Sequence, residues 1–167
     1  GLIDHFGGLD DLRAGILRAV GDSEKRFTED ALRIVRGLRF AAVFGFEIEK
    51  KTSNAIHELR HLLEHIAVER IWIEFSGLLC GSYAVPILRE YSDVVFEIIP
   101  ELEPEYGFDQ HNNFHKYDVW EHTLHALEAA PEDMDATVRF ALLLHDIGKP
   151  QCLSFDEQGR GHASGHE

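Results

Sequence analysis

The chain has 167 residues, of which 44% are hydrophobic, and a formal net charge of −14 at pH 7. It is long enough for one or two modest hydrophobic cores, and no apolar run approaches the roughly 18 residues that a membrane-spanning helix needs. We therefore expect a globular, cytoplasmic protein without a membrane segment or signal peptide. Cys80 and Cys152 lie far apart and form no Cys-x-x-Cys pair, which indicates reduced thiols.

The negative charge is concentrated in the later part of the chain. Residues 1–51 contain nine Lys or Arg and nine Asp or Glu, whereas residues 52–167 contain seven and twenty-one. The first third is therefore the expected place for contact with nucleotide phosphates or an RNA end. The remainder should repel polyanions unless a metal ion intervenes.

Apolar residues at helical spacing recur along most of the chain and predict an all-α fold. A strand-like start at residues 3–4 and a Gly7-Gly8 turn precede the first helix. The predicted helices cover residues 9–20, 28–44, 51–63, 68–79, 83–99, 118–130 and 133–147. Between the helices predicted over 83–99 and 118–130, the prolines and glycine of residues 100–107 open a polar loop. We therefore expect two domains, 1–104 and 105–167.

The helix predicted over residues 28–44 combines a buried face with a polar one. Apolar side chains at helical spacing form the buried face, at positions 31, 35, 38 and 42. Asp30, Arg33 and Arg36 lie three residues apart and share another face, so Asp30 and Arg33 can contact one ligand together. A carboxylate accepts from an exocyclic amino group and an Arg donates to ring acceptors, which matches the edge of cytosine or adenine. Uracil and guanine present a carbonyl oxygen to Asp30, at a cost of about 1–3 kcal/mol.

The same spacing also suits an ordinary surface ion pair between Asp30 and Arg33. Such a pair contributes well under about 1 kcal/mol to stability and requires no ligand. The residues surrounding the pair distinguish the two interpretations.

Those surroundings resemble the family of tRNA nucleotidyltransferases and poly(A) polymerases, which includes the enzymes that add CCA to tRNA 3′ ends. The resemblance rests on Gly-Gly-x-x-Asp-Leu at residues 7–12, Leu-Arg at 17–18, Glu-Asp-x-x-Arg-x-x-Arg at 29–36 and Arg-Phe-Ala at 39–41. A Glu-Arg segment with a later Glu, at 69–74, also matches. The resemblance to this family implies a helical neck and body over residues 1–104.

In that family the Glu-Asp-x-x-Arg helix serves as a protein template for incoming CTP or ATP. The resemblance therefore implies that Asp30 and Arg33 select the base, and that Arg36 and Arg39 steady Asp30 or approach phosphate. It also implies a set of residues that support the helix, namely Glu29, Glu69, Arg70 and Glu74.

The family's catalytic head, with a phosphate-binding turn and paired carboxylates that hold two Mg²⁺ ions, corresponds to sequence that would precede this chain. Asp10 and Asp11 form a carboxylate pair in a Gly-rich turn, and we interpret them as a helix cap. We therefore expect no catalytic residue of nucleotide transfer in this fragment, and no nucleotide addition by the fragment alone.

A second group of polar residues lies beyond residue 105. His122 follows a predicted helix start, and His145-Asp146 ends an aliphatic run, where burial is costly without a partner. Imidazole nitrogen and carboxylate oxygen suit Mn²⁺, Co²⁺, Ni²⁺ or a similar divalent ion. The segment resembles the HD superfamily of metal-dependent phosphohydrolases, and this resemblance implies His122, His145 and Asp146 as metal ligands.

Three further residues are candidates for the same metal cleft, namely His115, Lys149 and His166. For His166 a solvated terminal side chain is an equal alternative. The fourth HD ligand, a later Asp, has no counterpart at the expected distance, so residues 105–167 correspond to the first part of an HD domain.

The sequence thus predicts a fragment of a CCA-adding or poly(A)-adding nucleotidyltransferase, acting on a tRNA 3′ end with CTP, ATP and Mg²⁺. It implies no membrane partner and no particular oligomeric state. Two other functions remain open, a metal-dependent HD phosphohydrolase and a non-catalytic helical module that binds RNA.

Overall fold

The computed structural model describes residues 3–108, 117–155 and 161–163. The chain forms two compact units, Gly1–Ile98 and Ile99–Glu167. Most described residues are helical, which confirms the predicted all-α class. None of the described helices has the length and apolar character that crossing a membrane requires.

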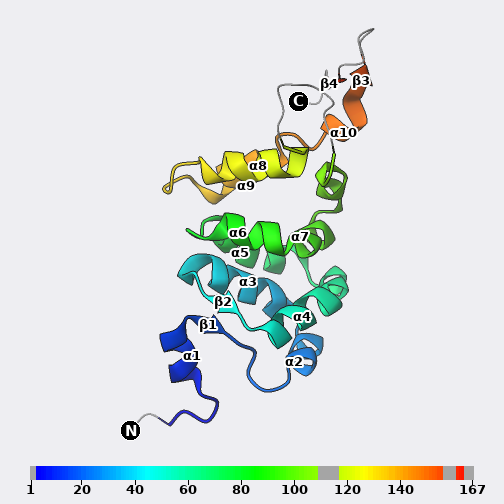
Figure 1. The fold of residues 1–167 in the computed structure, drawn as a ribbon. Helices are drawn as coiled ribbons and strands as arrows, with labels where there is room; N and C mark the ends of the chain where they lie inside the picture. The colour runs from blue at the N-terminus through cyan, green and yellow to red at the C-terminus, as the bar shows by residue number, and fades with distance from the viewer. Residues whose placement is uncertain (1–2, 109–116, 156–160, 164–167) are drawn as a thin grey trace. The chain divides into compact units, whose positions relative to one another are not determined.

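Unit 1 is a helical array with one short strand pair (Figure 1). Strand β1 pairs in parallel with β2, with Ile16 opposite Glu47 and Leu17 opposite Ile48. Its elements are α1 (Gly8–Ala14), β1 (Ile16–Leu17), α2 (Ser23–Glu29), α3 (Leu32–Phe44), β2 (Glu47–Ile48), α4 (Lys50–Leu59), the 3₁₀ helix η1 (Arg60–His65), α5 (Val68–Leu79), α6 (Ala84–Glu90) and α7 (Ser92–Ile98).

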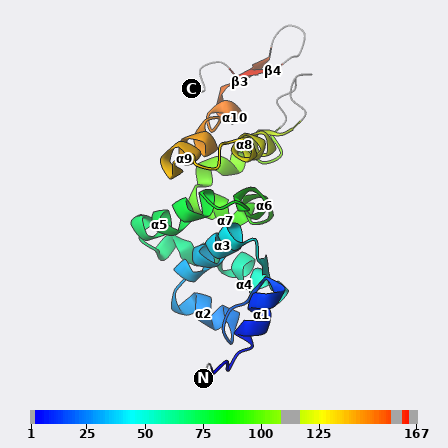
Figure 2. The same cartoon turned by 90° about the vertical axis from the view of Figure 1, so that its left-hand side faces the viewer.

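Helix α3 lies at the centre of unit 1 and packs most extensively against α5, with α6 as a further neighbour (Figures 1 and 2). The predicted apolar face of α3 is buried, because Ala31, Val35, Leu38 and Ala42 are each at most 5% exposed. Burial of this face supplies most of the driving force that holds the helix in place.

Gly81, just after α5, lets the end of this helix approach the backbone of α3. A methyl group at position 81 would lie 2.6 Å from the carbonyl carbon and oxygen of Ala42. A hydrogen bond two residues further along the chain confirms this close approach, because the Tyr83 N–H donates to the Ala42 carbonyl oxygen at 2.8 Å. The α3–α5 packing therefore depends on the absence of a side chain at residue 81.

The helix predicted over residues 9–20 is wrong in its second half. Helix α1 ends at Gly15, which adopts the left-handed conformation with φ 68°, and the chain then enters β1. A glycine C-cap of this kind ends a helix regardless of the apolar residues that follow.

The helix predicted over residues 28–44 is also divided. Asp30 is extended, with φ −156° and ψ 101°, and separates α2 from α3. Its carboxylate Oδ1 accepts from the Leu32 N–H at 3.2 Å, so a short polar side chain competes with the helical backbone at this point. Similar interruptions divide the region predicted as one helix over 83–99, at Tyr91, and turn the end of 51–63 into η1.

Unit 2 contains a helical pair and a small hairpin. Helices α8 and α9 pack together, and β3 pairs with β4 in antiparallel fashion. Its elements are the 3₁₀ helix η2 (Pro100–Glu105), α8 (Val119–Glu128), α9 (Ala136–Leu144), α10 (Lys149–Cys152), β3 (Leu153–Phe155) and β4 (Gly161–Ala163). Because η2 contacts α8 and α10, the unit boundary precedes η2, whereas the sequence predicted residues 104/105.

Asp118 caps α8, as predicted, by accepting from the Glu121 N–H at 2.7 Å. The following helix is shorter than the predicted range 133–147. Asp135 caps its start through the Thr137 N–H, and it ends at Leu144, immediately before His145. Pro150 does not end this helix but lies inside α10.

Two glycine substitutions test the α3–α5 packing in opposite directions. Gly81→Ala should destabilise the protein by about 1–3 kcal/mol because the added methyl group overlaps the Ala42 backbone. The matched control is Gly37→Ala within α3, where the nearest atom would be 3.9 Å away. This change should stabilise by about 0.5–1 kcal/mol through helix propensity. Urea unfolding followed by circular dichroism measures both, and equal effects would contradict the packing argument.

Candidate functional site

Asp30 presents a half-buried carboxylate at the junction between α2 and α3. Oδ1 accepts from the Leu32 N–H, and Oδ2 lies 3.5 Å from Arg70 Nη2 of α5. The Asp30 side chain is 34% exposed. Because a carboxylate offers about four acceptor positions, these two contacts leave capacity for a ligand donor.

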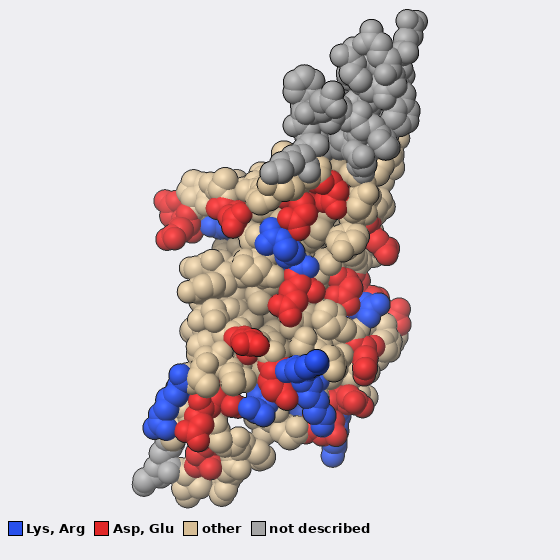
Figure 3. Space-filling view, viewed as in Figure 1, with Lys and Arg blue, Asp and Glu red and all other residues tan. Residues whose placement is uncertain are grey.

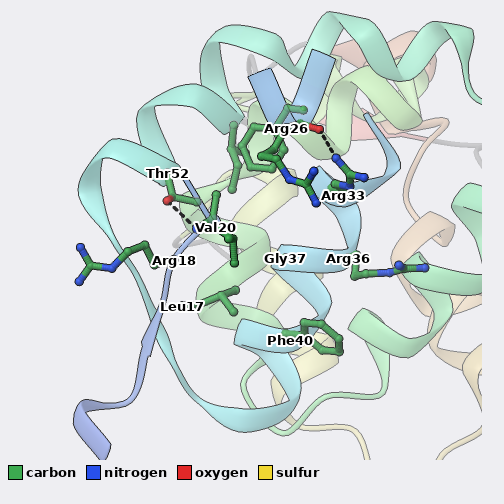
Figure 4. Close-up of a pocket in the computed structure, with 12 residues that line it drawn as sticks. Leu17, Arg18, Val20, Arg26, Arg33, Arg36, Gly37, Phe40 and Thr52 are labelled. Atoms are coloured by element: carbon green, nitrogen blue, oxygen red, sulfur yellow. Dashed lines mark hydrogen bonds between the residues drawn. The ribbon is translucent and has the colours of Figure 1, made fainter. Parts of the chain in front are cut away.

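Arg33, on the first turn of α3, is held by the end of α2. Its Nη1 donates to the Arg26 carbonyl oxygen at 2.8 Å (Figure 4). The same nitrogen also donates to Glu29 Oε2 at 3.0 Å. Arg26 Nη1 donates to the same Glu29 oxygen at 2.9 Å. Among the described residues both hydrogen bonds of Arg33 start from Nη1, so the N–H groups of Nη2 and Nε remain available to a ligand.

Glu74 of α5 binds two guanidinium groups of α3. Arg36 Nε and Nη2 donate to Glu74 Oε1 at 3.0 and 2.8 Å. Arg39 Nε lies 3.1 Å from Oε2, close enough for an ion pair although the contact lacks hydrogen-bond geometry. The Glu74 side chain is only 5% exposed, whereas that of Arg36 is 51% exposed. Glu74 therefore holds the guanidinium groups of both Arg side chains, while the Arg36 side chain as a whole stays partly accessible.

These contacts assign the supporting partners more specifically than the sequence did. Arg70, and not Arg36 or Arg39, contacts Asp30, while Arg36 and Arg39 contact Glu74. Glu69 is exposed in the first turn of α5. The predicted roles of these residues toward a nucleotide remain predictions.

A pocket of about 210 Å³ opens beside Arg33 and Arg36. In Figure 4, Leu17, Val20 and Phe40 line its apolar part, and Gly37 contributes backbone without a side chain. The full lining comprises Leu17, Arg18, Ala19, Val20, Arg26, Phe27, Arg33, Arg36, Gly37, Phe40, Thr52 and Ile56. Three of the four guanidinium groups come from α2 and α3, so the pocket combines an apolar floor with a cationic rim.

Arg26 was not predicted as a site residue, although it shares Glu29 with Arg33. The only available signal was its Glu three residues later, a spacing that is common on helices.

Basic and acidic side chains are intermixed on the molecular surface, where Figure 3 shows Lys and Arg among Asp and Glu. Such pairing limits binding of an extended polyanion and favours local recognition.

The carboxylates near the start of the chain have structural partners. Asp4, not the Asp10-Asp11 pair, caps α1, because its oxygens accept from the Gly8 and Leu9 N–H groups at 3.0 and 2.9 Å. These bonds lower the pKa of Asp4, with the Leu9 bond as the largest cause. Asp11 instead accepts two hydrogen bonds from Arg18, at 2.8 and 2.9 Å.

In unit 2 the structure brings His122 of α8 together with His145 and Asp146, which follow α9. Asp146 Oδ2 lies 3.5 Å from His122 Nε2 and 3.1 Å from His145 Nε2. Among the described residues this is the one group of three potential ligands whose donor atoms all lie within 4.8 Å of one another. Asp146 is 2% exposed, so its charge is poorly solvated.

The three side chains fit a divalent metal ion. Two atoms that each lie about 2.1 Å from a metal are about 3.0–3.4 Å apart at angles of 90–109°, similar to the observed spacing. His145 Nδ1 lies 2.7 Å from the Leu142 carbonyl oxygen, which can only accept, so Nδ1 carries a proton. Nε2 then faces the Asp146 carboxylate and is positioned to bind a metal ion together with it.

Two further charged groups lie in the same region. Lys149 Nζ is 2.7 Å from Asp146 Oδ2, so one of the three cleft candidates contacts a predicted ligand. Glu105 of η2 is fully buried, and burial, followed by the charge of Asp146, raises its pKa to about 7. Glu105 was not predicted as a site residue, because it stands in an acidic, proline-containing run that is typical of exposed loops.

The other histidines differ in their surroundings. His125, on α8, contacts Glu128 at 3.2 Å and packs against the Tyr117 ring, away from the three-residue group. The predicted cleft candidates His115 and His166 lie outside the described residues.

Solved structures of tRNA-processing enzymes share this fold. The CCA-adding enzyme of Bacillus stearothermophilus, in complex with CTP, is 34% identical with a TM-score of 0.68, and the match covers 89% of this chain and 35% of that one. A tRNA-processing enzyme with CTP is 27% identical with a TM-score of 0.58, over 86% of this chain and 40% of the other.

Curated relatives and a family model point to the same class. The CCA-adding enzyme of Leuconostoc mesenteroides subsp. mesenteroides is 55% identical over 100 residues, 59% of this chain and 25% of that protein. That of Bacillus mycoides is 46% identical over 103 residues, 61% of this chain and 26% of that protein. Residues 45–105 match the family model described as the probable RNA- and SrmB-binding site of polymerase A.

By these similarities the chain matches a fragment of the CCA-adding enzymes and poly(A) polymerases. It spans about a quarter of the length of the curated relatives that it matches.

The bond between Arg33 and Glu29 can be tested by titration. Glu29 has a pKa below its usual value of 4.5, chiefly because of the hydrogen bond from Arg33. Since the charged form is favoured in the folded state, this stabilising contribution is complete above about pH 4.5 and is lost as the pH falls through the lowered pKa. Arg33→Gln should therefore raise the Glu29 pKa toward 4.5, as measured by carboxyl ¹³C NMR. Arg13→Gln, which removes the partner of Asp10, should leave it unchanged.

Proposed function

We propose that this chain supplies the base-selecting helix of an enzyme that adds CMP and AMP to tRNA 3′ ends. The observation that carries the proposal is the geometry at the start of α3. There the Asp30 carboxylate keeps acceptor capacity, and Arg33 is held through Nη1 with its other donors available. Acceptor and donors together match the hydrogen-bonding edge of cytosine or adenine.

The neighbouring contacts support the same proposal. Glu29 and the end of α2 fix Arg33, while Glu74 fixes Arg36 and Arg39. A base-reading pair gains selectivity when its side chains are held in place before the ligand arrives. One solved structure named as a CCA-adding enzyme is in complex with CTP, which supports CTP as a ligand. We add ATP as the second nucleotide, the 3′ end of tRNA as acceptor and the cytoplasm as the location of the protein.

Metal ions are part of the proposal. CCA-adding enzymes are nucleotidyltransferases that use divalent metals. We assign Mg²⁺ to nucleotide transfer, where it would stabilise charge on the phosphates, and Mn²⁺, Ni²⁺ or Co²⁺ to His122, His145 and Asp146. The described residues of unit 1 contain no comparable cluster of ligands.

Base selection can be tested on this chain by calorimetric titration with each of the four nucleoside triphosphates. CTP and ATP should bind about tenfold to a hundredfold more tightly than UTP and GTP, because the latter place an acceptor against Asp30. Asp30→Asn preserves an acceptor for the Leu32 N–H but adds a donor, so it should reduce this preference. Arg33→Ala should weaken CTP and ATP alike.

Asp10→Asn is the control for this experiment, since Asp10 is an exposed carboxylate that pairs with Arg13. It should leave all four affinities unchanged. Unaltered selectivity in both Asp30→Asn and Arg33→Ala would contradict the proposal and leave an ordinary ion-pair cluster. RNA binding without nucleotide selectivity would instead favour the non-catalytic helical module.

A second candidate function is suggested by the three-residue group in unit 2. His122, His145 and Asp146 have the spacing of metal ligands, and a divalent ion there would activate water for attack on a phosphoester. We propose phosphohydrolase activity toward a phosphomonoester or a cyclic phosphodiester as the alternative activity of this unit.

Hydrolysis of p-nitrophenyl phosphate and of a 2′,3′-cyclic nucleotide, with Mn²⁺, Ni²⁺ or Co²⁺ added, tests this alternative. Activity should disappear in Asp146→Ala and on chelation of the metal. His125→Ala is the matched control on the same helix and should retain activity, because His125 pairs with Glu128 outside the group. Activity that survives Asp146→Ala would refute the assigned ligands.

A further inference from the structure

The charges around Asp146 are unusual because two buried carboxylates, those of Asp146 and Glu105, lie in the region of one ammonium group. Asp146 is 2% exposed and Glu105 is fully buried. Lys149 Nζ contacts Asp146 at 2.7 Å, and its side chain is only 12% exposed. The other buried cation of the described part of unit 2, Arg139, donates instead to the carbonyl oxygens of Pro131 and Met134. Lys149 therefore supplies an ammonium counter-charge to Asp146.

Lys149 and a metal ion would compete for the same oxygen atom. The Asp146 Oδ2 that Lys149 contacts is also the oxygen that faces both His122 Nε2 and His145 Nε2. A divalent cation bound by these three side chains would lie next to the Lys149 ammonium group. The metal ion and the ammonium group would repel each other strongly, because the site is poorly solvated. Metal binding thus requires the ammonium group to leave Asp146.

Glu105 provides a nearby acceptor for the displaced ammonium group. Helix η2, which carries Glu105, contacts α10, which carries Lys149. Thr123 Oγ1 donates to Glu105 Oε2 at 3.4 Å, whereas Oε1 is buried and has no hydrogen-bond partner among the described residues. A buried carboxylate oxygen of this kind is costly unless a donor or cation reaches it. Lys149 and Asp146 both influence the ionisation of Glu105, as expected for neighbouring groups.

We propose that Lys149 is a two-position counter-charge, which neutralises Asp146 without metal and moves to Glu105 when a divalent cation binds His122, His145 and Asp146. Glu105 is then a positioning residue that acts through Lys149 and does not contact the metal. The inference rests on the proposed metal site, and it assigns to Glu105 and Lys149 the control of that site's affinity.

The experiment is a double-mutant cycle with Mn²⁺ affinity as the readout, measured by calorimetry on the full chain. Glu105→Gln keeps the size of the side chain and an acceptor for Thr123 but removes the charge, so Mn²⁺ should bind about tenfold more weakly. Lys149→Met removes the competing ammonium group and should tighten Mn²⁺ binding by a similar factor. In the Lys149→Met background, Glu105→Gln should change the Mn²⁺ affinity by less than about twofold, because no displaced ammonium group remains for Glu105 to bind.

Glu103→Gln is the matched control, because Glu103 is an exposed acidic residue on the same 3₁₀ helix. It should leave Mn²⁺ affinity unchanged. An equal loss of affinity from Glu105→Gln with and without Lys149 would overturn the proposal, since Glu105 would then act on the metal directly. An unchanged affinity in Glu105→Gln alone would also overturn it.

A second measurement does not depend on the folding of any variant. In the wild-type chain, saturation with diamagnetic Zn²⁺ should shift the side-chain ¹³C signals of both Lys149 and Glu105 as the ammonium group changes partner. Zn²⁺ binding without a shift at Glu105 would overturn the exchange while leaving the metal site intact. Absence of any Mn²⁺ or Zn²⁺ binding by the wild-type chain would overturn the metal site and the exchange together.

Discussion

The contact between α3 and α5 is the constraint on which the rest of unit 1 depends. Gly81 brings the end of α5 to the backbone of α3, where a larger residue would overlap Ala42. On the same interface, the buried carboxylate of Glu74 binds Arg36 and Arg39 of α3. Removing one partner of such an ion pair leaves a poorly solvated charge, so the register of the two helices and the position of the Arg side chains are fixed together.

The candidate nucleotide site is organised around that fixed helix. Asp30 interrupts the chain just before α3, and its carboxylate both caps the helix and faces Arg70 of α5. Arg33 is held from the other side by α2 and Glu29. Because each charged group already has one partner, a ligand meets donors and acceptors in set positions and need not order them on binding. The apolar pocket beside them offers a surface for a planar ring.

The charged side chains of unit 2 differ from those of unit 1 in their burial. Apart from the buried Glu74, most of the acidic and basic side chains that pair in unit 1 do so at or near the surface, where each pair contributes little to stability. In unit 2, Asp146 and Glu105 are buried, and two imidazole rings face one carboxylate oxygen. Because a buried excess of negative charge favours a cation, unit 2 is the better candidate for a metal site, whereas the candidate site of unit 1 consists of hydrogen-bonding groups.

The sequence by itself determined the features that depend on neighbouring residues. Periodicity predicted the helical class, the buried face of α3 and the exact range of α5, and a side-chain cap predicted the start of α8. Only the tertiary structure decided the pairing of Arg36 with Glu74 and the burial of Glu105. The physical reason is distance along the chain. Helix periodicity and caps involve residues three or four apart, but the partner of Arg36 is separated from it by 38 residues and is brought near only by the packing of α5 on α3.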